Sequence, residues 1–149
     1  MQWLVPILLA AVCFGSYNFL IKLSAGHIHE ILGAAVLQGV ALGLGATALL
    51  FLKTRGIPLA SSPKGMGYAV AAGVFVGLAE ILSFYAFSKG LPATVGIPIL
   101  VGGTVLTGGL LGLLVLKETL SPLQYLAVAL ILTGVIIFVM DNGQKGMDN

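Results

Sequence analysis

The sequence has 149 residues, of which 58% are hydrophobic and only 8% are charged, and its mean hydropathy is +1.10. Soluble domains carry about 25% charged residues, so this chain has too few polar groups to cover a surface in water. The net charge of +2 is small and dispersed, which argues against a nucleic-acid partner. We therefore expect a protein that is embedded in a lipid bilayer.

Five hydrophobic stretches are long enough to cross the hydrocarbon core as helices, which takes about 20 apolar residues each. The first opens at Trp3 and is predicted to be a retained helix, because no basic residue precedes it as in a secretory signal. Ser121 and Pro122 are typical of the cap and first turn of the last helix. The predicted spans are 3–21, 31–52, 66–88, 93–116 and 123–140, followed by a polar tail over 141–149. The sequence thus predicts an all-α polytopic membrane bundle forming a single membrane domain over 1–149.

Glycines at four-residue spacing inside the spans predict flat stripes along the helices. In lipid no hydrophobic force drives helices together, so small residues matter because they let two backbones approach closely. We expect packing seams at six glycines: Gly39, Gly43, Gly73, Gly77, Gly108 and Gly112.

Basic residues are almost evenly divided between the two ends of the predicted spans. Four lie on the side of the N-terminus and three on the other: Lys53, Arg55, Lys64 and Lys117 against Lys22, Lys89 and Lys145. An excess of one gives almost no orientation signal. Two explanations stay open. Either the first helix fixes the orientation, or the chain inserts both ways and pairs with an inverted copy of itself.

One acid, Glu80, lies inside the third span, close to its middle. A charge there costs about 2.5–3.5 kcal/mol on insertion scales, so we expect the carboxyl group to face the interior. Gly73, Gly77, Ser83 and Phe84 share its helix face, and the small ones leave room for a helix or a cavity. Because burial disfavours an ionised carboxyl group, this site suits a proton- or cation-coupled carrier. A structural acid paired with a neighbouring helix is the open alternative.

Polar side chains on other spans are candidates for the same site. Asn18 lies on the same side of mid-depth as Glu80, so a shared ligand is geometrically possible. Tyr17 and Tyr85 are predicted to line a pathway or, alternatively, to anchor the helices at the interface. Gln38 is predicted to contact substrate or to join two helices by hydrogen bonds.

Proline and threonine residues bear on the shape of the fourth span. Pro98 frees the carbonyl group of Thr94 and predicts a hinge for alternating access or a static bend. Thr104 and Thr107 are expected to bond back onto their own helix. Lys22, at the end of the first span, is expected to reach the interface rather than the buried acid.

Catalytic and metal motifs are not predicted. His27, His29 and Glu30 form an exposed loop whose metal signal is weak, and Glu118 beside Lys117 is interpreted as a surface charge. A phosphate loop, a nucleophile elbow and an HExxH motif are absent from the sequence. We therefore predict no metal, no cofactor and no enzyme activity.

Several motifs resemble the five-helix EamA repeat of the drug/metabolite transporter superfamily. They are Phe14-Gly15-Ser16-Tyr17-Asn18 followed by Lys22, then Phe84-Tyr85-Ala86, Pro98, the segment 116–121, Gln124 and Gly134. The similarity covers nearly the whole chain. Lys117 stands where a glycine before the acid is usual, Ala127 stands where a glycine is common, and Gly102-Gly103 lies near the usual place of a second proline.

This resemblance implies transport of a metabolite, amino acid or drug without selecting among them. Most members carry two repeats in opposite orientations, whereas this sequence carries one. We therefore predict a small-molecule carrier that works as an antiparallel homodimer in the cytoplasmic membrane of a prokaryote. The alternative is a non-transporting membrane subunit that assembles with another membrane protein.

Overall fold

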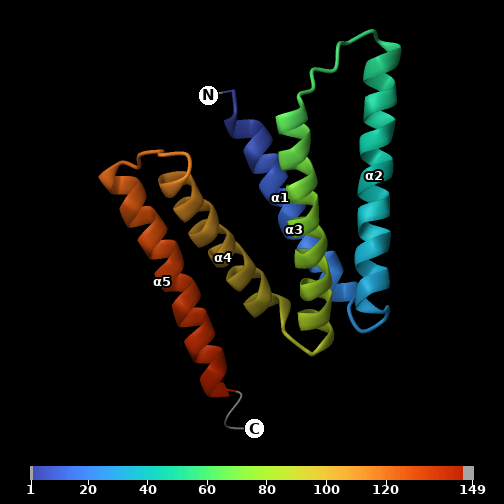
Figure 1. The fold of residues 1–149 in the computed structure, drawn as a ribbon. Helices are drawn as coiled ribbons and strands as arrows, with labels where there is room; N and C mark the ends of the chain where they lie inside the picture. Colours follow the sequence, from blue (N-terminus) through green and yellow to red (C-terminus); the bar gives the residue numbers. More distant parts are fainter. Residues whose placement is uncertain (1, 146–149) are drawn as a thin grey trace. The chain divides into compact units, whose positions relative to one another are not determined.

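The computed structural model describes residues 2–145, with side chains up to Asp141, and these residues form five α-helices and no β-strand (Figure 1). The helices are α1 (Leu4–Ser24), α2 (Glu30–Thr54), α3 (Pro63–Ser88), α4 (Ala93–Leu114) and α5 (Pro122–Lys145). Each is long and apolar enough to cross a membrane. The predicted all-α polytopic membrane architecture with about five spans is thus confirmed. Helix α5 continues into the predicted polar tail, of which residues 146–149 lie outside the described part.

Side chains that accept backbone hydrogen bonds fix the starts of α2 and α3. The Ile31 amide donates to Nδ1 of His29 at 3.3 Å, and the Gly65 amide donates to Oγ of Ser62 at 3.1 Å. The first amides of a helix have no partner within the helix, so these bonds define where each helix begins.

Helix α5 begins with a reciprocal pair of hydrogen bonds. The Gln124 amide donates to Oγ of Ser121 at 3.3 Å, and the Ser121 amide donates to Oε1 of Gln124 at 2.7 Å. This arrangement is a capping box. It confirms the helix start predicted from Ser121 and Pro122.

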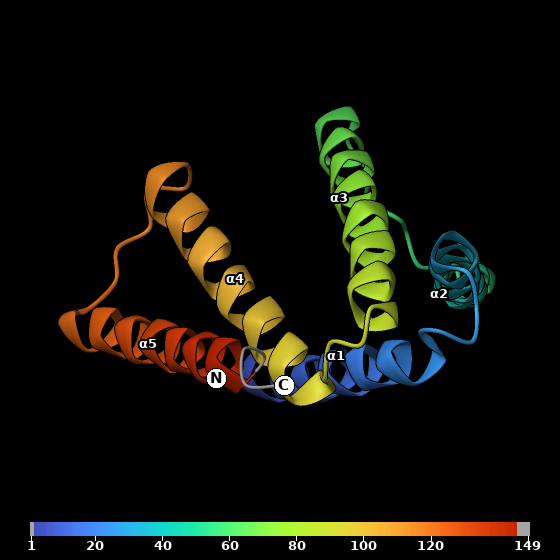
Figure 2. The same cartoon turned by 90° about the horizontal axis from the view of Figure 1, so that it is seen from below.

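The chain divides into two compact units. One unit comprises Leu20–Gly90 and contains the end of α1 with α2 and α3; the other comprises Met1–Phe19 and Leu91–Asn149 and contains α4 and α5. In the first unit α2 packs against α3, and in the second α4 packs against α5 (Figure 1). Figure 2 shows the same helices from below. Each unit is therefore organised around one helical hairpin.

Close approach between helices occurs at particular glycines. A Cβ placed on Gly33 would lie 2.7 Å from the ring of Phe84, and one on Gly77 would lie 3.3 Å from the amide of Gln38. Residue numbers rise along α2 as they fall along α3 in these two contacts, so the pair is antiparallel. In the other unit, a Cβ on Gly102 would lie 2.6 Å from a methyl group of Val135.

Most large apolar side chains of the chain are exposed, and they are spread over all five helices. The buried apolar core of the described chain consists of a few residues: Ile21, Ala34, Phe84, Phe87 and Val95. In water such a surface would be a large association liability. Around transmembrane helices it is the expected surface, because lipid chains are themselves apolar.

Candidate functional site

The buried face of α3 carries the polar groups that are most enclosed in the described chain. Glu80 is 3% exposed and Ser83 is 7% exposed, next to the buried rings of Phe84 and Phe87. These residues are three, four and seven positions apart and therefore share one face of the helix. The Glu80 side chain is therefore enclosed by the protein.

The depth of Glu80 follows from its place in the helix. It lies between four and five residues from the midpoint of Pro63–Ser88, which is about 7 Å along the axis at 1.5 Å per residue. The half-thickness of a hydrocarbon core is about 15 Å. Glu80 is therefore at membrane depth, where ionisable side chains are rare and commonly functional.

Gln38 of α2 lies on the same contact line as Glu80. The half-buried amide of Gln38 covers Gly77, which lies one turn before Glu80 on α3. Phe84, one turn after Glu80, contacts Gly33 of α2. Glu80 therefore lies between two points at which α2 and α3 touch. The structure brings Glu80, Gln38 and Gly77, all predicted from the sequence, to one side of α3.

Tyr17 and Asn18 belong to the other unit and are half-buried. The Asn18 amide nitrogen donates to the carbonyl oxygen of Phe14 at 2.8 Å. The ring of Tyr17 meets the ring of Phe14 edge to face, with centroids 5.7 Å apart. The side-chain oxygen of Asn18 is an acceptor that this bond to its own helix does not use.

Tyr85 and Pro98 occupy helix positions that differ in exposure. Tyr85 is exposed, and the ammonium group of Lys89 lies 5.1 Å from its ring centroid near the end of α3. This position suits the interfacial anchor that was the alternative to a pathway role. Pro98 is half-buried within α4, which continues through it from Ala93 to Leu114. The hinge at Pro98 stays a prediction.

Lys22, in the last turn of α1, contacts the end of α3. Its ammonium group donates to the carbonyl oxygen of Phe87 at 3.2 Å and lies 5.9 Å from the centroid of the Phe87 ring. A cation is favourable at the carbonyl end of a helix because it complements the helix dipole. Lys22 thus fastens α1 to α3, a role that the sequence did not reveal.

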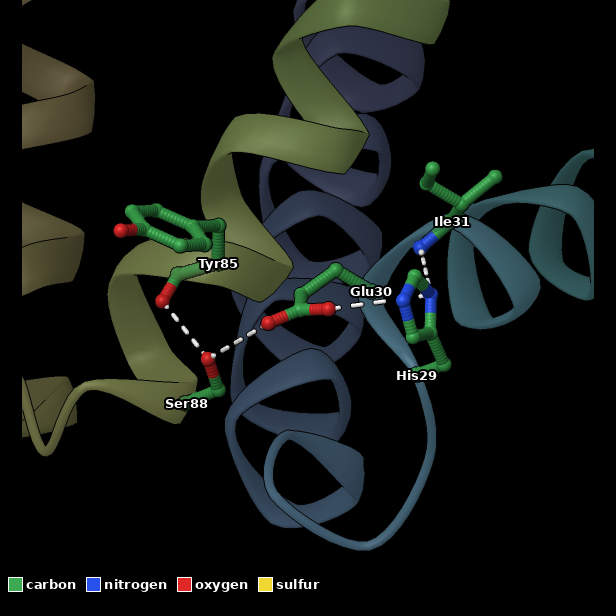
Figure 3. A network of polar contacts seen from close by, with 5 residues as sticks. All are labelled: His29, Glu30, Ile31, Tyr85 and Ser88. Atoms are coloured by element: carbon green, nitrogen blue, oxygen red, sulfur yellow. Dashed lines mark hydrogen bonds and ion pairs between the residues drawn. The ribbon is translucent and has the colours of Figure 1, made fainter.

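A second polar link joins the start of α2 to the end of α3 (Figure 3). The Ser88 hydroxyl lies 3.2 Å from Oε1 of Glu30 and 2.8 Å from the carbonyl oxygen of Tyr85. Oε2 of Glu30 lies 3.7 Å from Nδ1 of His29, whose side chain also accepts from the Ile31 amide. Glu30 and Ser88 are 58 positions apart, so no local sequence signal could have paired them.

The six glycines predicted as packing seams differ in their surroundings. Gly77 contacts Gln38, and a Cβ on Gly112 would lie 2.9 Å from the carboxylate of Glu118. The remaining four have nothing within 4 Å of an added Cβ: Gly39, Gly43, Gly73 and Gly108. For these four the packing role stays a prediction.

Two further expectations concern chemistry outside the α2–α3 pair. Thr104 and Thr107 donate to the carbonyl groups of Leu100 and Gly103, at 2.8 Å each, which confirms that they bond back onto α4. Within residues 2–145, no group of three or more histidine, cysteine, aspartate or glutamate side chains is placed to hold a metal ion.

Comparison with known proteins shows the family to which the chain belongs. The model of the EamA-like transporter family matches residues 1–140. An uncharacterized protein of Methanocaldococcus jannaschii is 31% identical over 101 residues, which are 68% of this chain and 72% of that protein. No solved structure matches the chain. Because the family match covers α1 to α4 and most of α5, the chain belongs to the EamA-like transporter family as a single five-helix repeat.

Proposed function

We propose that this protein carries a small molecule across the membrane, coupled to a proton or another cation. The observation that carries the proposal is the burial of Glu80, which is 3% exposed at membrane depth on the α2–α3 contact line. Membership of a transporter family supports the same conclusion.

The chemistry follows from the low dielectric constant around a buried carboxyl group. Such an environment disfavours a charged group that lacks a counter-charge. A proton and a cationic group of a substrate would therefore compete for Glu80. Gln38, Asn18, Tyr17 and Tyr85 are proposed to complete the lining, and the half-buried Pro98 is proposed as the hinge for alternating access.

The working unit is proposed to be an antiparallel homodimer in a prokaryotic cytoplasmic membrane. Two oppositely oriented copies would reproduce the inverted repeats on which many carriers are built. The near balance of basic residues between the two sides supports insertion in both orientations. The open glycine positions of α2, at Gly39 and Gly43, offer surface on which a second copy can approach closely.

The test begins with a ligand-stabilisation screen on the purified protein. The strongest stabiliser is then measured for uptake into proteoliposomes with and without a pH gradient. We expect Glu80→Gln to abolish gradient-driven uptake, because glutamine cannot release a proton. Glu118→Gln is the matched control, since Glu118 is exposed, and it should retain uptake.

Two results would count against this function. Gradient-driven uptake that is unchanged in Glu80→Gln would remove the acid from the mechanism. An absence of uptake by the protein alone, together with stoichiometric co-purification of another membrane protein, would favour a non-transporting subunit.

A further inference from the structure

The segment that joins α2 to α3 is the most strongly basic part of the chain. We call residues 53–64 the basic loop; it comprises the last two residues of α2, the connecting segment and the first two residues of α3, and it contains Lys53, Arg55 and Lys64. The sequence has no acid between Glu30 and Glu80. All three cationic residues are exposed. Because α2 and α3 are antiparallel spans, this loop lies at one membrane surface.

Two of these cations lie over aromatic rings at the helix ends. The Arg55 guanidinium lies 4.7 Å from the centroid of the Phe51 ring, and the Lys64 ammonium lies 6.0 Å from the centroid of the Tyr68 ring. Both rings are themselves exposed. Tyrosine side chains concentrate at the headgroup level of a bilayer, so the contact with Tyr68 favours a position of Lys64 at that level.

The basic loop also presents apolar side chains between its cations. Ile57 is 48% exposed and Leu59 is 50% exposed. Cations combined with exposed aliphatic side chains are typical of segments that bind a membrane surface, since the apolar groups enter the headgroup boundary while the cations meet anionic lipids.

The opposite end of the same unit is different. There Lys22 binds the Phe87 carbonyl oxygen, and the carboxylate of Glu30 lies among the polar groups at the end of α3. In the described part of the chain, no carboxylate lies within ion-pair distance of a cation of the basic loop. Positive charge is thus uncompensated at one end of the unit and partly compensated at the other.

We propose that the basic loop binds the headgroups of anionic phospholipids. The occupant is a lipid surface rather than a soluble anion, because the cations are spread over an exposed loop that also bears Ile57 and Leu59. Attraction to an anionic surface corresponds to about a fivefold gain in binding for each cation. Three cations together give a gain on the order of a hundredfold.

The test places an environment-sensitive fluorophore in the basic loop. Cys13 is the single cysteine and is exposed, so Ser61→Cys in a Cys13→Ala background accepts one nitrobenzoxadiazole label. The full-length labelled protein is placed in nanodiscs of phosphatidylcholine with increasing phosphatidylglycerol. We expect a blue shift that grows with the anionic fraction and is lost in 1 M salt, where the screening length falls to about 3 Å.

Variants separate charge from folding. At a limiting anionic fraction, each of Lys53→Gln, Arg55→Gln and Lys64→Gln should reduce the response about fivefold, and the triple variant should abolish it. Lys53→Arg with Lys64→Arg keeps the charge and should retain the response. Lys89→Gln, at the opposite end of the unit, is the control and should also retain it.

Three outcomes would overturn the proposal. The first is a fluorescence response that is the same in neutral and anionic nanodiscs. The second is equal loss of the response in Lys89→Gln and in the basic-loop variants. The third is a response to inorganic phosphate or glycerophosphoglycerol in neutral nanodiscs, which would indicate a soluble-anion site instead of a lipid contact.

Discussion

Replacing Gly33 by alanine perturbs the closest contact between α2 and α3. The added Cβ would lie 2.7 Å from Cε1 and 2.8 Å from Cζ of Phe84, whose side chain is buried and cannot easily move aside. Overpacking of this kind costs about 1–3 kcal/mol. Alanine also gains about 1 kcal/mol over glycine in helix propensity, so the net change in unfolding free energy lies between near zero and about 2 kcal/mol of destabilisation.

Gly45→Ala separates the two effects, because it lies in the same helix and an added Cβ there meets nothing within 4 Å. This control should be neutral or stabilising. The difference between the two variants is then the packing cost, about 1–3 kcal/mol. Reversible unfolding of the monomeric, detergent-solubilised protein by sodium dodecyl sulfate measures both. Equal stability of the two variants would refute the packing geometry assigned to Gly33.

Three further predictions address the other unit and the topology. Lys117 has a φ of 56°, a left-handed conformation that costs a non-glycine residue about 1 kcal/mol. Lys117→Gly should therefore raise the unfolding temperature, and a decrease would contradict this. Gly102→Ala should destabilise the α4–α5 hairpin by about 1–3 kcal/mol, because the added Cβ would overlap the side chain of Val135. Adding Val135→Ala should restore part of that loss in the same unfolding assay. Failure of this rescue would show that the strain arises at another contact. A reporter fused to the C-terminus should be active on both sides of the membrane, and added lysines on one side should shift that ratio; activity on one side alone would show a fixed orientation.

The helices were predictable from the sequence because lipid imposes a simple length and polarity requirement on each span. Local chemistry was predictable for the same kind of reason. Ser121 and Pro122 form a helix start through neighbours three residues away, and Thr104 and Thr107 bond to carbonyl groups one turn earlier. Such interactions need no knowledge of which helices meet.

Contacts between helices were not predictable in the same way. Four-residue spacing identifies a flat stripe but not the helix that covers it, and neither Gly33 nor Gly102 has a glycine four residues away. The pairing of Glu30 with Ser88 depends on the register of the hairpin. Glu118 is exposed, as a surface charge should be, yet its carboxylate covers Gly112, a contact that depends on the turn at Lys117.

The positive φ at Lys117 gives a physical reason for the glycine that is usual at this place in the family. Glycine adopts that backbone conformation without a steric penalty from Cβ. Lysine at position 117 therefore lowers the stability of the turn before α5. It does not change the residues on the buried face of α3.

The most direct test of the account is chemical modification of Glu80 by dicyclohexylcarbodiimide, an apolar reagent for protonated carboxyl groups. We expect modification of Glu80, identified by peptide mass spectrometry, and its suppression by the transported compound, because both occupy the same buried site. Modification of Glu80 at the same rate with and without that compound would show that Glu80 is not part of the transport site.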